Sequence, residues 1–173
     1  MKKILNKYFL SNRHPGIIIL LGQEAWSAYL SQDAQTTEKI HNIPAIVGMV
    51  SRNAIILPND SLSLDKWNPE SIDALKDSYR IHKMVGYIYQ YDVDKNIKLI
   101  QDLYPKTKHV ALVTDNTYGG VSLQAYVKKE ITKFRGLDLI LLDGRKNSIY
   151  TIVDSINKLP DNTVMLLGTW RVD

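Results

Sequence analysis

The 173-residue chain contains no cysteine, which excludes disulfide bonds, thiolate catalysis and cysteine-based metal sites. It also has no apolar stretch near the ~20 residues that a membrane-spanning helix needs. Two lysines follow Met1, as in a signal peptide, but Lys7, Arg13 and His14 interrupt the apolar region that such a peptide requires. We therefore expect that any export signal lies outside this sequence.

Motifs that carry catalysis or bind metals are also missing from the sequence. The histidines show no zinc-ligand spacing, and there is no Gly-x-Ser-x-Gly elbow. Ser51 follows a predicted strand, but no residue nearby in the sequence can serve as its base. Gly119 and Gly120 lack a Walker lysine and the Gly-x-Gly-x-x-Gly spacing, so they predict a turn rather than a phosphate site. We expect no metal, no cofactor and no enzymatic activity.

The charge pattern does not indicate a nucleic-acid partner. The net charge is +4 and the pI is near 9.1, but the lysines and arginines are scattered and usually lie near acids. Apolar residues make up 45% of the chain and charged residues 23%. This composition is typical of a globular protein with a sizeable core.

Short, nearly continuous runs rich in Ile, Val and Leu recur along the chain. Such runs predict strands buried on both faces, as in a parallel sheet. The runs are Ile17–Leu21, Ala45–Val50, Met84–Tyr89, Val110–Thr114, Leu137–Leu142 and Val164–Leu167.

Segments with helical spacing of apolar residues alternate with these runs, and strand–helix alternation predicts an α/β fold. Asn68, Asp92 and Asn147 are predicted to cap three of the helices, and Pro105 and Pro160 to end two of them. The predicted helical segments are residues 4–9, 24–32, 68–79, 92–104, 119–134 and 148–158.

Polar and aromatic residues follow the predicted strands, where open parallel sheets bind ligands. These residues can equally act only as turn and cap residues. Arg52 and Arg171 could hold a carboxylate, and Trp26 and Trp170 could be stacking walls or core anchors. The candidate ligand-binding residues are Gln23, Glu24, Trp26, Ser51, Arg52, Asn53, Asp115, Asn116, Tyr118, Gly119, Asp143 and Trp170.

Three segments resemble ABC-type substrate-binding proteins of the type I periplasmic-binding-protein fold. They are "PGIIILLGQEAW", "HNIPAIVGMVSRN" and "MVGYIYQYDVDKNIKLIQDLYPKTKHVALVTDNTYGGVSLQAYVKKEI". The ending "LLGTW" is closer to related sensor domains of bacterial hybrid histidine kinases. The resemblance implies two Rossmann-like lobes, a first at residues 1–88 and a second at residues 89–173, with a ligand between them. It carries a ligand-facing role onto Gln23, Glu24, Ser51, Arg52, Asn53, Asp115, Asn116 and Tyr118.

Two departures from the family pattern bear on the expectation. Family members have a further strand–helix–strand portion before the segment matching Ile17 and continue past the segment matching Trp170. We therefore expect an incomplete domain; a small sheet with frayed ends is the alternative. The family often has Asp-Pro where this chain has Ser51, Arg52 and Asn53, so ligand chemistry does not transfer.

These features together favour an extracytoplasmic ligand-sensing domain of a two-component histidine kinase, on the periplasmic or extracellular face of a bacterial membrane. The expected partner is a small molecule, and a homodimer is compatible with this role. Membrane attachment would come only from parts outside this chain. The alternatives are a solute-binding component of an ABC transporter and an enzyme on a flavodoxin-like sheet.

Overall fold

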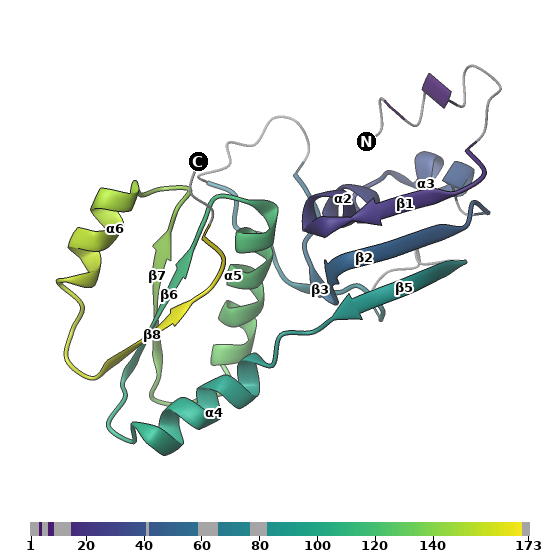
Figure 1. Cartoon of the computed structure of the whole chain (residues 1–173). Helices are drawn as coiled ribbons and strands as arrows, with labels where there is room; N and C mark the ends of the chain where they lie inside the picture. Colours follow the sequence, from purple (N-terminus) through teal and green to yellow (C-terminus); the bar gives the residue numbers. More distant parts are fainter. Residues whose placement is uncertain are drawn as a thin grey trace. The chain divides into compact units, whose positions relative to one another are not determined.

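A computed structural model of the chain describes residues 4, 7–8, 15–40, 42–58, 66–76 and 83–170. The chain divides into two compact units, which are described separately. Unit 1 comprises Met1–Leu57 and Ile72–Gln90, and unit 2 comprises Pro58–Ser71 and Tyr91–Asp173. Each unit contains a three-stranded parallel sheet with flanking helices, so the predicted α/β class is confirmed (Figure 1). The division at residues 88–89 and the likeness of the units to periplasmic-binding lobes stay predictions.

The sheet of unit 1 has the strand order β1-β2-β5, and a short antiparallel pair, β3 with β4, accompanies it. Helices α2 and α3 connect β1 to β2. The elements are β1 (Ile18–Leu21), α2 (Gly22–Leu30), α3 (Ala34–Ile40), β2 (Ala45–Ser51), β3 (Asn53–Ala54), β4 (Ile72–Asp73) and β5 (Met84–Tyr89).

Among the described residues, the sheet of unit 1 is packed on one face only. Leu20 and Val47 belong to a core that includes α2, whereas Ile19, Ile46 and Val85, which lie side by side in register, are 61%, 40% and 68% exposed. The prediction that these strands are buried on both faces is therefore wrong. The strand order explains this, because β1, β2 and β5 succeed one another in one direction. Right-handed connections then fall on the same face.

A local irregularity in β2 depends on one glycine in β5. The pairing of β2 with β5 shifts register between Val47 and Val50, and Met49 has a φ of 56°. Gly86, the partner of Val47, has a φ of 146°. A Cβ at Gly86 would collide with the backbone carbonyl of Val47, so only glycine fits there.

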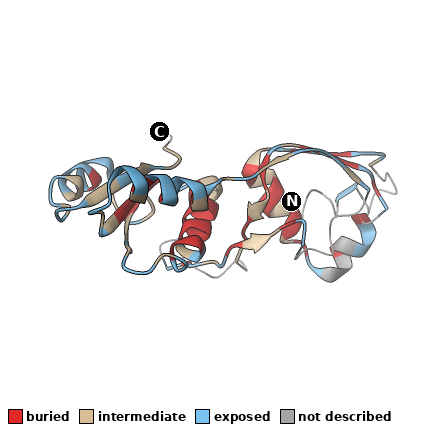
Figure 2. Ribbon diagram, turned by 90° about the horizontal axis from the view of Figure 1, so that it is seen from below, coloured by how far each residue is buried: buried red, intermediate tan, exposed pale blue. Residues whose placement is uncertain are grey.

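The sheet of unit 2 has the strand order β7-β6-β8, with β6 in the centre. All residues of β6 except His109 are buried, and Leu112 packs with Val127 of α5 and Ile97 of α4. Helix α5 is buried from Val121 through Val127 (Figure 2). The elements are α4 (Val93–Leu103), β6 (His109–Thr114), α5 (Tyr118–Ile131), β7 (Asp138–Asp143), α6 (Ile149–Ile156) and β8 (Thr163–Leu167).

The helix predicted to begin at Asn68 is not formed. Ile72 and Asp73 instead make β4, and a turn follows. Backbone pairing with β3 is stronger than the local cap signal here, because Ala74 N donates to Arg52 O at 2.9 Å and the Asp73 carboxylate binds the Arg52 side chain. The remainder of that predicted helix, residues 77–79, lies outside the described residues.

Four other predicted helices are formed, as α2, α4, α5 and α6. Helix α4 ends before Pro105 as expected, but the Asp92 side chain makes no cap hydrogen bond and pairs with Lys95. Ser148, not Asn147, caps α6, since its hydroxyl accepts from Thr151 N. Helix α3 was not predicted, and the first predicted helix lies mostly outside the described residues. Over the part of the chain that is described, no helix is long and apolar enough to span a membrane.

Candidate functional site

The carboxyl ends of β6 and β8 form a topological switch point in unit 2. The chain leaves β6 through α5 to reach β7, then returns through α6 to β8 on the opposite side of β6. Open α/β sheets bind ligands beyond the carboxyl ends of the strands at such a point. The two loops at this point are residues 115–120 and 168–170.

Asp115 joins these two loops. Its Oδ1 accepts hydrogen bonds from Thr117 N (3.1 Å), Thr117 Oγ1 (2.6 Å) and Thr169 Oγ1 (3.2 Å), and its backbone N donates to Thr169 O at 2.8 Å. The side chain is buried, and Gly120 approaches it so closely that a Cβ there would collide with the carboxylate. Asp115 therefore organises the site rather than presenting a solvated carboxylate to a ligand.

Three predicted residues beside Asp115 are accessible. Asn116 is exposed, and Tyr118 and Gly119 are partly exposed at the first turn of α5. The hydroxyl of Thr117 caps this helix by accepting from Gly120 N at 3.1 Å. These residues offer an amide, a phenol and helix-terminal N–H groups, which are groups that orient small polar ligands.

A cavity of about 220 Å³ adjoins the β8 side of the switch point. Its floor is apolar and includes Leu112, Leu123 and Leu166, while Asn96 and Thr169 add polar groups. A few polar groups around an apolar floor are typical of small-molecule sites. The other lining residues are Tyr91, Asp92, Val93, Val127, Leu167 and Gly168.

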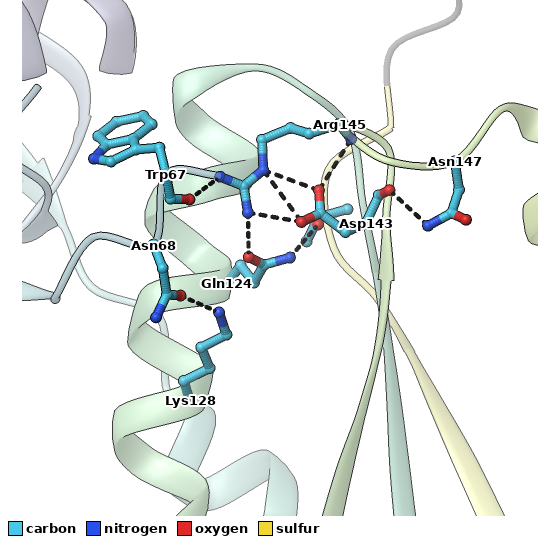
Figure 3. Close-up of polar contacts among 8 residues, drawn as sticks. Trp67, Asn68, Gln124, Lys128, Asp143, Arg145 and Asn147 are labelled. Carbon is cyan, nitrogen blue, oxygen red and sulfur yellow. Dashed lines mark hydrogen bonds and ion pairs between the residues drawn. The ribbon is translucent and has the colours of Figure 1, made fainter. Parts of the chain in front are cut away.

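Asp143 ends β7 but is committed to an ion pair. Arg145 Nη2 lies 2.6 Å from Asp143 Oδ2, and the two side chains are only 4% and 6% exposed. The same guanidinium donates to Gln124 Oε1 at 2.8 Å and to the carbonyl of Trp67 at 2.5 Å (Figure 3). Burial by itself raises the pKa of Asp143, but hydrogen bonds from Arg145 and Gln124 outweigh it and lower the pKa below its ordinary value. Asp143 is thus a structural carboxylate that orients Arg145, and Arg145 in turn binds the carbonyl of Trp67.

The two tryptophan candidates differ in how far they are buried. Trp26 has no exposed surface; its Nε1 donates to Ser51 O at 3.1 Å and its ring stacks on Tyr29. Trp170 is partly buried against the cluster that includes Val113 and Ile152. Trp26 therefore acts as a core anchor, whereas Trp170 keeps part of its surface exposed.

The remaining candidates in unit 1 lock the end of β2 to α2. Gln23 Oε1 accepts from Ser51 N at 2.9 Å, and Gln23 Nε2 donates to Asn53 O at 3.4 Å. Ser51 Oγ accepts from Asn53 N at 3.2 Å. Among the predicted residues of this unit, Glu24 is partly exposed and its side chain makes none of these contacts.

Arg52 binds a carboxylate of this chain. Its Nε and Nη2 donate to Asp73 at 2.7–3.0 Å, in the forked geometry expected for a carboxylate ligand. The hydrogen bond from Arg52 lowers the pKa of Asp73, with burial opposing it. Arg171, the second arginine proposed for a carboxylate clamp, lies outside the described residues.

Sequence reasoning missed three residues that shape these sites, namely Trp67, Gln124 and Asp73. Each acts on a partner 21 or more positions away, so no local spacing could have indicated it. Of the four histidines, only His109 is described; its Nδ1 lies 3.7 Å from Asp138 Oδ2, and His14, His41 and His82 lie outside the described residues. Within the described residues, no group of three or more His, Asp or Glu side chains could hold a metal ion.

Comparisons with known proteins do not assign the chain to a family. No family model, no curated protein and no solved structure matches this chain.

Proposed function

We propose that the chain is a ligand-sensing domain that binds a small polar molecule at the switch point of unit 2. The observation that carries this proposal is the convergence of the loops after β6 and β8 on Asp115. Their hydrogen bonds order the loop that carries the accessible Asn116 and Tyr118, and Thr169 of the second loop lines the apolar cavity. Preorganisation lowers the entropic cost of binding, because the site is already formed.

Binding without turnover fits the chemistry of the nearest acids. Asp115 accepts three hydrogen bonds, and Asp143 is paired with Arg145, whose hydrogen bonds keep its pKa low. A general acid needs a proton near neutral pH, and the hydrogen bonds from Arg145 favour the ionised form of Asp143 instead. The role as a sensor of a two-component histidine kinase rests on the sequence resemblance. There a ligand would signal by stabilising the conformation that it binds more tightly.

The test is a thermal-shift screen of the chain against sugars, amino acids, nucleobases, peptides and small acids. A ligand that binds only the folded state raises the melting temperature by mass action. We expect a hit to be lost in Tyr118→Ala and kept in Tyr150→Ala. Tyr150 is a suitable control because it is an 81%-exposed tyrosine in the first turn of another helix, α6. Equal responses of the two variants, or release of a chemically altered ligand, would contradict the proposal.

A further inference from the structure

The outward face of the unit 1 sheet carries a continuous apolar surface. Ile19, Ile46 and Val85 lie side by side in register across β1, β2 and β5. Leu21 and Tyr87, two positions further along β1 and β5, point to the same side because side chains alternate along a strand. This surface, here called the open face, is 40–74% exposed at each of its residues, which are Ile17, Ile19, Leu21, Ile46, Met49, Val85 and Tyr87.

The open face is larger than the apolar patches that single chains usually expose. Its exposed fractions correspond to roughly 800–900 Å² of accessible surface, against about 300–600 Å² for the largest patch on a typical monomer. All residues of the open face are uncharged, and Gly48 completes the outward side of β2 beside Leu21. Sheets with one solvated face normally alternate apolar inward residues with polar outward ones. The apolar outward residues of this sheet therefore indicate a face that another surface covers.

The size and the chemistry of the open face fit a second copy of the chain. An interface of standard size buries about 800 Å² on each partner, which is close to the whole open face. A two-fold axis brings the same patch of both copies together, so each residue faces residues of that patch. Uncharged apolar side chains meet one another without like-charge repulsion, whereas nucleic acid or an anionic membrane would select a surface rich in lysine and arginine.

We propose that the chain forms a homodimer in which the open faces of two unit 1 sheets pack against each other. Sheets stacked face to face lie about 10 Å apart with their strand directions within about 30°, and their side chains interdigitate. Tyr87 and Met49, the two most exposed residues of the open face, are of types that are enriched in protein interfaces. The dimer core would thus be built from the face that the single chain leaves exposed, with no residue taken from the ligand site proposed in unit 2.

Sedimentation velocity over a range of protein concentrations tests the proposal on the chain itself. We expect a monomer–dimer equilibrium. Ile19→Lys would bury an ammonium without a partner in the interface, so it should weaken dimerisation at least about ten-fold. Leu103→Lys is the matched control and should dimerise like the original chain, because Leu103 of α4 is 63% exposed and Ile19 is 61% exposed. Below the dissociation constant the monomer predominates, and its own stability should change little with substitutions on the open face.

Hydroxyl-radical labelling tests the same face without a substitution. Labelling of Tyr87 should fall as the dimer forms, whereas labelling of Tyr150, which is 81% exposed on α6, should not. Val85→Lys serves if Ile19→Lys does not fold. A monomer at every concentration would overturn the proposal, whether the open face is then accessible or is covered by another part of this chain or by a different partner. A dimer that both lysine variants form as tightly as the original chain would overturn it as well.

Discussion

Removing the guanidinium of Arg145 should destabilise unit 2 far more than an average substitution. Arg145→Met leaves the Asp143 carboxylate without its partner and deprives Gln124 Oε1 and the Trp67 carbonyl of a donor. Because the paired side chains are only 4% and 6% exposed, water cannot replace the lost contacts. Breaking a buried pair from one side costs about 3–5 kcal/mol. For a chain of this length, the melting temperature should fall by roughly 6–20 °C.

The matched control is Arg52→Met in unit 1. Arg52 also donates two hydrogen bonds from its guanidinium to a carboxylate, that of Asp73. The side chains of Arg52 and Asp73, however, are 29% and 22% exposed. Solvent screens such a pair, so its loss should cost about 1 kcal/mol or less. Urea denaturation followed by circular dichroism measures both variants against the original chain.

The stability lost in Arg145→Met should also depend on pH in a predictable direction. In the original chain the folded-state pKa of Asp143 lies below its ordinary value of 3.8, so the stabilisation is present above that value and is lost as pH falls through the folded pKa. Arg145→Met removes the side-chain hydrogen bond and the charge that lower the pKa of Asp143, and it keeps the hydrogen bonds from the backbone N of residue 145 and from Gln124. The folded pKa of Asp143 should therefore rise, and the deficit of the variant should shrink as the pH falls from 7 to 4.

Two outcomes would refute this reasoning. One is a loss below about 1 kcal/mol at pH 7, which is the size expected of an exposed pair. The other is a deficit that stays constant between pH 7 and pH 4. Asp143→Leu combined with Arg145→Met should restore part of the lost stability, because no buried charge is then left unpaired.

Three further predictions concern stability measured by denaturant unfolding. Leu20→Ala should cost about 2–5 kcal/mol and Leu21→Ala within about 0.5 kcal/mol, since these neighbours are 1% and 64% exposed; equal losses would contradict the one-sided sheet. Gly86→Ala should cost about 3 kcal/mol or more, because its Cβ meets the Val47 carbonyl at a positive φ, and a stable variant would rule out this geometry. Ser148→Ala should cost about 1 kcal/mol as a lost helix cap, and no change would argue against the cap.

Strand positions were the most predictable part of the fold. The run Met84–Tyr89 coincides with β5, and Ala45–Val50 falls one residue short of β2. Continuous apolar runs indicate strands reliably because every residue of a central strand such as β6 meets a packed neighbour. The apolar runs did not reveal that Ile19 and Val85 lie on an exposed face of the sheet. That depends on the order of the strands, which the residues of a single run do not indicate.

Local signals failed where a distant partner offered a better contact. Asn68 and Pro69 resemble a helix start, but Asp73 pairs with Arg52, and β4 forms against β3. Among the site candidates, Asp115, Asn116 and Tyr118 lie in the loop and first helical turn after β6, as predicted, and their role as ligand-binding residues stays a prediction. The position after a strand did not distinguish the accessible candidates from Trp26, whose ring is fully buried.

The sequence by itself determined the α/β class, the positions of the six strands in the two parallel sheets and the residues found at their ends, because apolar runs, caps and breakers act over short distances along the chain. Only the tertiary structure decided which strand-end residues stay accessible. Arg145 meets Trp67, and Thr169 meets Asp115, across separations of 78 and 54 residues. Such contacts depend on strand order and register, and these follow from the packing of the whole unit.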